Sequence, residues 1–191
     1  MTSWPFGSLQ MFGYGAILAD PPWSYEMYSD KGYGKAPEAH YATMNDDAIK
    51  ALPVNHLAAR DCILFMWAIW PKADVALEVM KAGGFKFKTG GAWHKRTTHG
   101  KTAFGPGCIC RTASEPYFGG TIGRPELGSK SIRNLIDAKT RGHSRKPDDM
   151  RRMALSMAVL TQVRVGIQRY GLALAELEFA EDSLRVDQRL L

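Results

Sequence analysis

One stretch in the middle of the chain constrains the fold more than any other. Residues 61–68, DCILFMWA, form an apolar run of strand length, and residues 71–82 carry apolar side chains at helical spacing. Gly83-Gly84 ends the helical pattern, and the alternating segment 85–88 predicts a further strand that reaches Trp93. A strand, a helix, a glycine turn and a strand in this order are typical of β-α-β units around a mainly parallel sheet. We therefore expect an α/β fold.

Other segments extend this pattern. An apolar run is stopped abruptly by Asp-Pro-Pro, which suits a buried strand, and Pro147 is placed as a proline in the first turn of a helix. The segments that we expect to form further strands are 15–19, 108–111, 115–120 and 132–138.

The composition allows one domain of this kind. The chain has 191 residues, of which 45% are hydrophobic and 23% charged, which suffices for one buried core and is too short for two. Its formal net charge of +6 is compatible with a polyanionic partner such as a nucleic acid. Because many small basic proteins bind no nucleic acid, the charge alone leaves both interpretations open.

Cysteine and histidine usage argues against a disulfide framework and a structural metal. The three cysteines, Cys62, Cys108 and Cys110, cannot all pair, and the five histidines lack the spacing of metal ligands. The sequence has no apolar run of about 18 residues, the length of a membrane span, and its N-terminus does not resemble a signal peptide. We expect a cytoplasmic protein that has no metal and no membrane partner.

The most distinctive segment is ILADPPW, residues 17–23. Asp20 follows a predicted strand, and ligands of open α/β sheets bind at the carboxyl ends of strands. Two prolines remove two N–H donors but keep their carbonyls free as acceptors. The Asp20 carboxylate and the Pro21 carbonyl could therefore receive both hydrogens of an amino group on an aromatic ring, while Trp23 offers a face for stacking a base. The alternative is an ordinary Asp-Pro turn followed by a core tryptophan.

No other segment offers a convincing catalytic set. The chain contains no nucleophile elbow, no Walker lysine loop and no GxGxxG run. The DPPW segment therefore remains the main candidate for chemistry.

Several motifs together give the chain a family resemblance. Asp20-Pro21-Pro22-Trp23 resembles the D/N-P-P-Y/F/W motif of amino-methyltransferases, and four further runs match downstream: AHYATM at 39–44, RTASEP at 111–116, GRP at 123–125 and HSRKPD at 143–148. The chain resembles the family that contains the catalytic subunit of the eukaryotic mRNA adenine methyltransferase and its short bacterial and phage relatives. The resemblance runs from about residue 4 to about residue 153, and DPPW combined with HSRKPD is its most specific part.

The resemblance implies a fold, a cofactor and a reaction. The fold would be Rossmann-like, the cofactor S-adenosylmethionine, and the reaction methylation of the exocyclic 6-amino group of adenine in nucleic acid. DNA is preferred over RNA because the short relatives are prokaryotic or phage-borne. Residues 1–160 would form the methyltransferase domain, and residues 161–191 an atypical tail or the divergent end of that domain. A monomer and a homodimer are both compatible with the sequence.

The motifs also carry site residues over to this chain. The resemblance places the cofactor carboxylate at Lys146, beside a helix start that favours anions. The alternatives are a solvated charge at Lys146, a packing aromatic at Tyr41 and a strand-capping acid at Glu115. The predicted catalytic residues are Asp20, Pro21, Pro22 and Trp23; the predicted cofactor-binding residues are Asp20, His143, Ser144 and Lys146; and the predicted substrate-binding residues are Tyr41, Trp93, Lys95 and Glu115.

The end of the chain departs from the family pattern. The family has an aromatic-Ala/Gly-Arg strand end, then a tryptophan and a Gly-Asn pair that hold the cofactor, whereas no tryptophan follows Trp93 here. Two functions therefore stay open. The first is an active adenine methyltransferase, whose basic loops 24–40 and 95–105 would grip the nucleic acid. The second is a catalytically impaired homologue that binds nucleic acid or serves as a scaffold.

Overall fold

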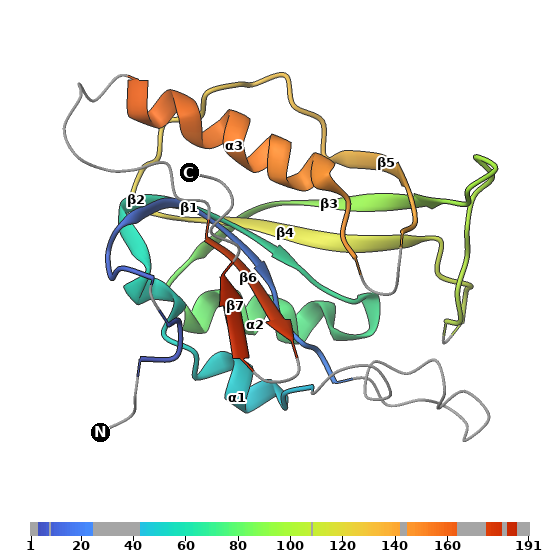
Figure 1. Ribbon diagram of the computed structural model, residues 1–191, viewed down its shortest axis with the longest axis horizontal. Helices are drawn as coiled ribbons and strands as arrows, with labels where there is room; N and C mark the ends of the chain where they lie inside the picture. Colours follow the sequence, from blue (N-terminus) through green and yellow to red (C-terminus); the bar gives the residue numbers. More distant parts are fainter. Residues whose placement is uncertain are drawn as a thin grey trace.

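The chain forms one seven-stranded sheet covered by helices on both faces. The computed structural model describes residues 4–7, 9–24, 43–107, 109–141, 145–163, 175–180 and 183–186. The strands follow the order β5-β3-β4-β2-β1-β6-β7 across the sheet (Figure 1). Their bounds are β1 Tyr14–Asp20, β2 Ala58–Trp67, β3 Lys86–Arg96, β4 Ser114–Ile122, β5 Leu135–Lys139, β6 Ala175–Ala180 and β7 Ser183–Val186.

Five of the seven strands point the same way. β1 runs parallel to β2 and β6, and β3 runs parallel to β5, whereas β4 is antiparallel to both β2 and β3, and β7 is antiparallel to β6. The predicted α/β fold of Rossmann-like type is therefore confirmed. The insertion of β4 between β2 and β3 was not predicted. The two antiparallel pairings of β4 and that of β6 with β7 make three of the six strand pairings antiparallel, so the sheet is mixed although most strands point the same way.

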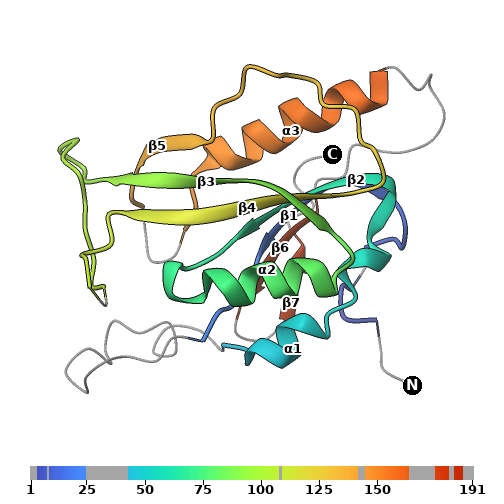
Figure 2. The ribbon, with the colours of Figure 1, turned by 180° about the vertical axis from the view of Figure 1, so that it is seen from behind.

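The helices lie on opposite faces of the sheet. α3 (Asp148–Val163) covers one face, while α1 (Asp46–Lys50) and α2 (Ala73–Ala82) lie on the other, as the two opposite views agree (Figure 2). Two short 3-10 helices, η3 (Val54–His56) and η4 (Trp70–Lys72), precede β2 and α2. Within the described residues, no helix combines the length and apolarity needed to cross a membrane.

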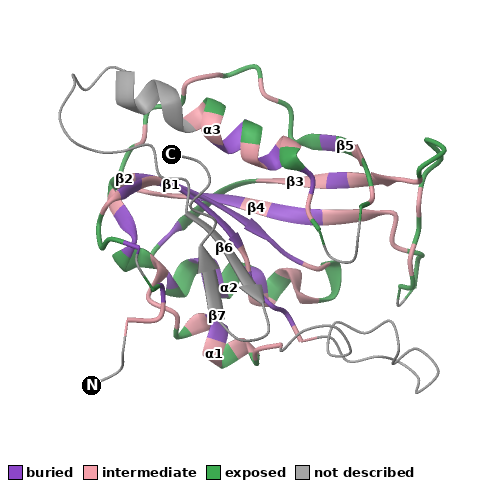
Figure 3. Cartoon of the chain, in the orientation of Figure 1, coloured by how far each residue is buried: buried purple, intermediate pink, exposed green. Residues whose placement is uncertain are grey.

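The direction of the side chains alternates along β1 and β2, which explains why the sheet is covered on both sides. β1 and β2 send Ile17 and Leu64 into the core beneath α1 and α2, and send Leu18 and Phe65 into the core beneath α3. Successive strand residues point to opposite faces, so an unbroken apolar run requires cover on both. The central strands are accordingly the most buried part of the molecule (Figure 3).

Local sequence sets the helix starts. The Asn45 side chain caps α1 by accepting a hydrogen bond of 2.7 Å from the Ala48 N–H. α3 begins directly after Pro147, with Asp148 and Asp149 in its first turn, where carboxylates are favoured by the helix dipole. The predicted helix is therefore confirmed, but Pro147 lies just before its first turn and not within it.

Two predicted strands differ from the structure. Cys108 lies outside the described residues, and residues 109–111 form no strand; Ile109 is 98% exposed. Glycines on either side of Pro106 precede this segment and favour a loop. The strand expected from Ile132 begins instead at Leu135. β6 and β7, which come from the segment expected to be an atypical tail, extend the same sheet beside β1.

Candidate active site

The carboxyl edge of the sheet carries the candidate site. Asp20 is the last residue of β1, which lies between β2 and β6 in the middle of the sheet. β4 runs the opposite way, so its first residues lie at the same edge as the last residues of β3, and Glu115 pairs with Trp93. The loop between β3 and β4 therefore brings Glu115 to the edge that Asp20 occupies.

The DPPW motif, residues 20–23, forms a tight turn with its carbonyls already engaged. The Trp23 N–H donates to the Pro21 carbonyl at 2.9 Å, and the Met44 N–H donates to the Pro22 carbonyl at 2.9 Å. The expectation that both carbonyls are free is therefore wrong. Each oxygen keeps a second lone pair, so the Pro21 carbonyl can still accept one further hydrogen bond.

Trp23 points into the protein. Its side chain is 4% exposed, and its indole N–H donates to the Trp67 carbonyl at 3.1 Å. A large aromatic ring gains more from burial than from exposure once its single donor is satisfied. The prediction that Trp23 offers a stacking face is therefore wrong, and the residue instead anchors the DPPW turn to the end of β2.

Four charged side chains of alternating sign meet at this edge, and we call them the charged cluster. Lys146 Nζ lies 3.1 Å from Asp20 Oδ2 and 2.9 Å from Glu115 Oε1. Lys95 Nζ lies 2.7 Å from the other oxygen of Glu115, Oε2. The exposed fractions of these side chains range from 14% for Glu115 to 27% for Asp20 and Lys95. The charged cluster therefore joins β1, β3, β4 and the residues before α3, and its side chains are partly buried.

The opposite charges of the cluster offset the cost of burying each charged group. Burial alone would raise the pKa of Glu115, but the ammonium groups of Lys146 and Lys95 lower that pKa below its usual range. Burial alone would lower the pKa of Lys146, but Asp20 and Glu115 raise it above the ordinary lysine value. Glu115 and Lys146 therefore both stay charged at neutral pH.

Two tryptophans support the lysines of the cluster. Lys146 Nζ lies 5.9 Å from the centre of the Trp67 ring, and Lys95 Nζ lies 5.1 Å from the centre of the Trp93 ring. Trp93 itself is 4% exposed, and its indole N–H donates to the Ala138 carbonyl at 2.9 Å. Trp93 thus packs beneath Lys95, and its predicted contact with a substrate is not supported.

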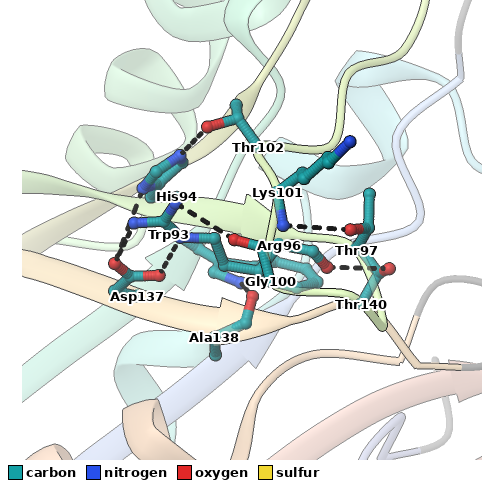
Figure 4. A network of polar contacts seen from close by, with 10 residues as sticks. All are labelled: Trp93, His94, Arg96, Thr97, Gly100, Lys101, Thr102, Asp137, Ala138 and Thr140. Atoms are coloured by element: carbon teal, nitrogen blue, oxygen red, sulfur yellow. Dashed lines mark hydrogen bonds and ion pairs between the residues drawn. The ribbon is translucent and has the colours of Figure 1, made fainter.

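Next to the cluster, the end of β3 is fastened to β5. Arg96 pairs with Asp137 through two parallel contacts of 2.7 Å, and His94 Nε2 lies 3.0 Å from Thr102 Oγ1 (Figure 4). The turn 97–101 closes with a 2.8 Å bond from the Thr97 N–H to the Lys101 carbonyl. Gly100 has φ +78°, a conformation that favours glycine. These bonds fix the backbone that carries His99 and Lys101 beside the end of β3.

The structure brings together only part of the predicted site. Asp20, Lys95, Glu115 and Lys146 meet in the charged cluster. The predicted residues Tyr41, His143 and Ser144 lie outside the described residues. Sequence reasoning missed Trp67, although its position at the end of a predicted strand was the signal that could have found it. Within the described part of the chain, no group of three or more His, Cys, Asp or Glu residues is placed to hold a metal ion.

Comparison with known proteins identifies several relatives of the chain. Type II methyltransferase M.MunI of Mycoplasma sp. is 28% identical over 160 residues, which cover 74% of this chain and 66% of that protein. Two plant proteins are each 29% identical over 143 residues, which cover 72% of this chain: the N(6)-adenosine-methyltransferase MT-A70-like of Arabidopsis thaliana, of which 19% is covered, and a putative N(6)-adenosine-methyltransferase MT-A70-like of Medicago truncatula, of which 21% is covered.

The chain thus spans slightly less than two thirds of M.MunI and about a fifth of the plant proteins. The sequence model of the MT-A70 family matches residues 14–167, which include the DPPW motif and the whole charged cluster. The chain therefore belongs to the MT-A70 family.

Proposed function

We propose that the protein transfers a methyl group from S-adenosylmethionine to the exocyclic 6-amino group of adenine in nucleic acid. The observation that carries the proposal is the position of Asp20. It ends a central strand, begins the DPPW turn and contacts the charged cluster, all within a chain of the MT-A70 family. The relatives named above are a type II methyltransferase and proteins named as N(6)-adenosine-methyltransferase MT-A70-like, which supports this reaction class.

The chemistry of Asp20 and Lys146 fits the cofactor. The methionine end of S-adenosylmethionine carries one ammonium and one carboxylate, and the two side chains offer a carboxylate and an ammonium 3.1 Å apart. Asp20 would face the cofactor ammonium and Lys146 the cofactor carboxylate. When bound, S-adenosylmethionine supplies an electrophilic methyl group on a positively charged sulfur.

The residues of the chain would prepare the adenine amine. The Asp20 carboxylate accepts one N–H, and the remaining lone pair of the Pro21 carbonyl accepts the other. Both hydrogen bonds draw the nitrogen lone pair out of the ring and aim it away from the DPPW turn. Asp20 takes up the proton that the methylated nitrogen releases and passes it to water. Glu115 keeps Lys146 bound while Asp20 engages the amine.

The basic edge of the sheet supports nucleic acid as the substrate. We use this name for Lys95, Arg96, His99, Lys101 and Lys139, at the carboxyl ends of β3 and β5 and in the turn between β3 and β4. Lys101 and Lys139 are exposed, and neither forms an ion pair with another described residue. Exposed ammonium groups at a site edge suit contacts to phosphates.

DNA is the preferred substrate in this proposal, and RNA is the alternative. Of the relatives named above, M.MunI is the one of which this chain covers the largest share. A target adenine within a duplex would have to be flipped out to reach Asp20. The proposal also treats residues 161–191 as the divergent end of the same domain, since β6 and β7 extend the sheet beside β1.

The experiment combines cofactor binding with methyl transfer. The full chain is titrated with S-adenosylmethionine by calorimetry and then incubated with adenine-containing DNA and RNA oligonucleotides and labelled cofactor. We expect binding, with label in N6-methyladenine after digestion to nucleosides. Asp20→Ala should abolish transfer, whereas Asp74→Ala, at an exposed carboxylate on α2, should not. A folded wild-type protein that binds no cofactor would overturn the proposal and favour the scaffold alternative.

A further inference from the structure

A lysine outside the predicted site ties down the exit of the DPPW motif. Lys72 lies in η4, after β2, and its Nζ donates to Ser24 Oγ at 3.0 Å and to Asp46 Oδ1 at 2.5 Å. Ser24 is the residue immediately after Trp23, and Asp46 is the first residue of α1. One ammonium group therefore joins three segments that are far apart in the sequence.

The same place is also held by backbone contacts. Met44 pairs with Trp23 in an isolated parallel bridge, and its N–H donates to the Pro22 carbonyl at 2.9 Å. The Trp23 indole is bound to Trp67, at the end of the strand that leads into η4. The motif is thus fixed by β2 on one side and by the residues before α1 on the other, and Lys72 bridges the two.

The Lys72 contact differs from an ordinary surface ion pair. The side chains of Lys72 and Asp46 are 19% and 32% exposed. Lys50 and Glu78, which join α1 to α2 nearby, are 30% and 64% exposed, and among the described residues no hydroxyl group accepts a second hydrogen bond from Lys50. An ammonium with two acceptors in a less exposed position restricts geometry more than an exposed pair, which contributes little.

We propose that Lys72 is a positioning residue for methyl transfer. It holds Ser24 against the start of α1 and thereby fixes the DPPW turn, so that Asp20 and the Pro21 carbonyl face the amine together. This inference rests on the proposed function, but its structural part can be tested without it. A misplacement of about 1 Å at reacting groups can cost about 100-fold in rate.

The test compares Lys72→Met with Lys50→Met, which removes a neighbouring ion pair of the same charge type. Hydrogen exchange of the backbone amides of Trp23 and Met44 reports the turn directly. We expect Lys72→Met to speed this exchange about tenfold or more, and Lys50→Met to leave it unchanged. In methyl transfer, Lys72→Met should lower kcat by about 10- to 100-fold with a much smaller change in KM for the nucleic acid.

Two milder variants keep the test informative if Lys72→Met does not fold. Ser24→Ala removes one acceptor and should give an intermediate effect on exchange and kcat, while Lys72→Arg should restore much of both. The inference is overturned if Lys72→Met leaves the exchange of the Trp23 and Met44 amides unchanged. If Lys72→Met does not fold, unchanged exchange in Ser24→Ala has the same consequence. Both outcomes hold whether or not the protein methylates adenine. Inactivity of the wild-type protein would overturn the proposed function and the role of Lys72 in methyl transfer, while the exchange data would still decide whether Lys72 fixes the DPPW turn.

Discussion

Replacement of Lys146 by methionine tests how strongly the charged cluster holds the site together. The ammonium contacts Asp20 at 3.1 Å and Glu115 at 2.9 Å, and its side chain is 19% exposed. Breaking a fully buried ion pair by removing one partner costs about 3–5 kcal/mol. Because the partners are 27% and 14% exposed, solvent offsets part of this penalty. We expect Lys146→Met to lower the free energy of unfolding at pH 7 by about 2–3 kcal/mol.

The pH dependence follows from the direction of the pKa shifts. The folded-state pKa of Glu115 is lowered, so its contribution is present above its unfolded pKa of about 4.3 and is lost as pH falls through the folded value. The folded-state pKa of Lys146 is raised, so its contribution is complete below about pH 10.4 and is lost only as pH rises through the folded value. At neutral pH both contributions are therefore present.

Loss of Lys146 removes the ammonium group that contacts the carboxylates of both Asp20 and Glu115. Glu115 then keeps its contact with Lys95 but loses the Lys146 ammonium, so its pKa should rise in the variant. The stability gap to wild type should be largest above about pH 5 and should narrow as pH falls and the carboxylates protonate. Urea unfolding at pH 7 and pH 4.5 measures it, with Lys88→Met as an exposed control. A gap below about 0.5 kcal/mol, or one independent of pH, would refute the reasoning.

Three further predictions concern the basic edge, a buried thiol and a strand contact. Lys101→Ala should weaken binding to DNA oligonucleotides and lower the salt slope by about one, whereas Lys88→Ala, at the other end of β3, should do neither. Burial raises the pKa of the fully buried Cys62 to about 12, so iodoacetamide at pH 8 should label exposed Cys110 and spare Cys62 until the protein unfolds. Gly91→Ala should destabilise by about 1–3 kcal/mol in thermal unfolding, because a methyl group there would clash with β4 and with the residue before β5.

The sequence predicts the central part of the fold because its patterns are local. The apolar run at 61–68, the helical spacing after it and the Gly83-Gly84 turn became β2, α2 and the start of β3. The direction and position of β4 could not be read from its own residues, because alternation is the same for parallel and antiparallel strands. Its insertion between β2 and β3 depends on long-range pairing.

The site residues also divide into those that local motifs predict and those that depend on long-range contacts. Motifs placed Asp20, Glu115 and Lys146 in the site, and the structure joins them through ion pairs. The inward direction of Trp23 could not be predicted, since two prolines interrupt the strand periodicity that would have given its face. Lys72 was missed because its contacts with distant segments leave no mark in the sequence around it.

Methyl transfer by the wild-type protein and by Asp20→Ala tests the central claim most directly. The full chain is incubated with labelled S-adenosylmethionine and DNA, and the digested nucleosides are analysed by mass spectrometry. We expect N6-methyladenine with the wild-type protein and none with Asp20→Ala, although both bind DNA. Equal transfer by the two proteins, or label in a base other than adenine, would contradict it.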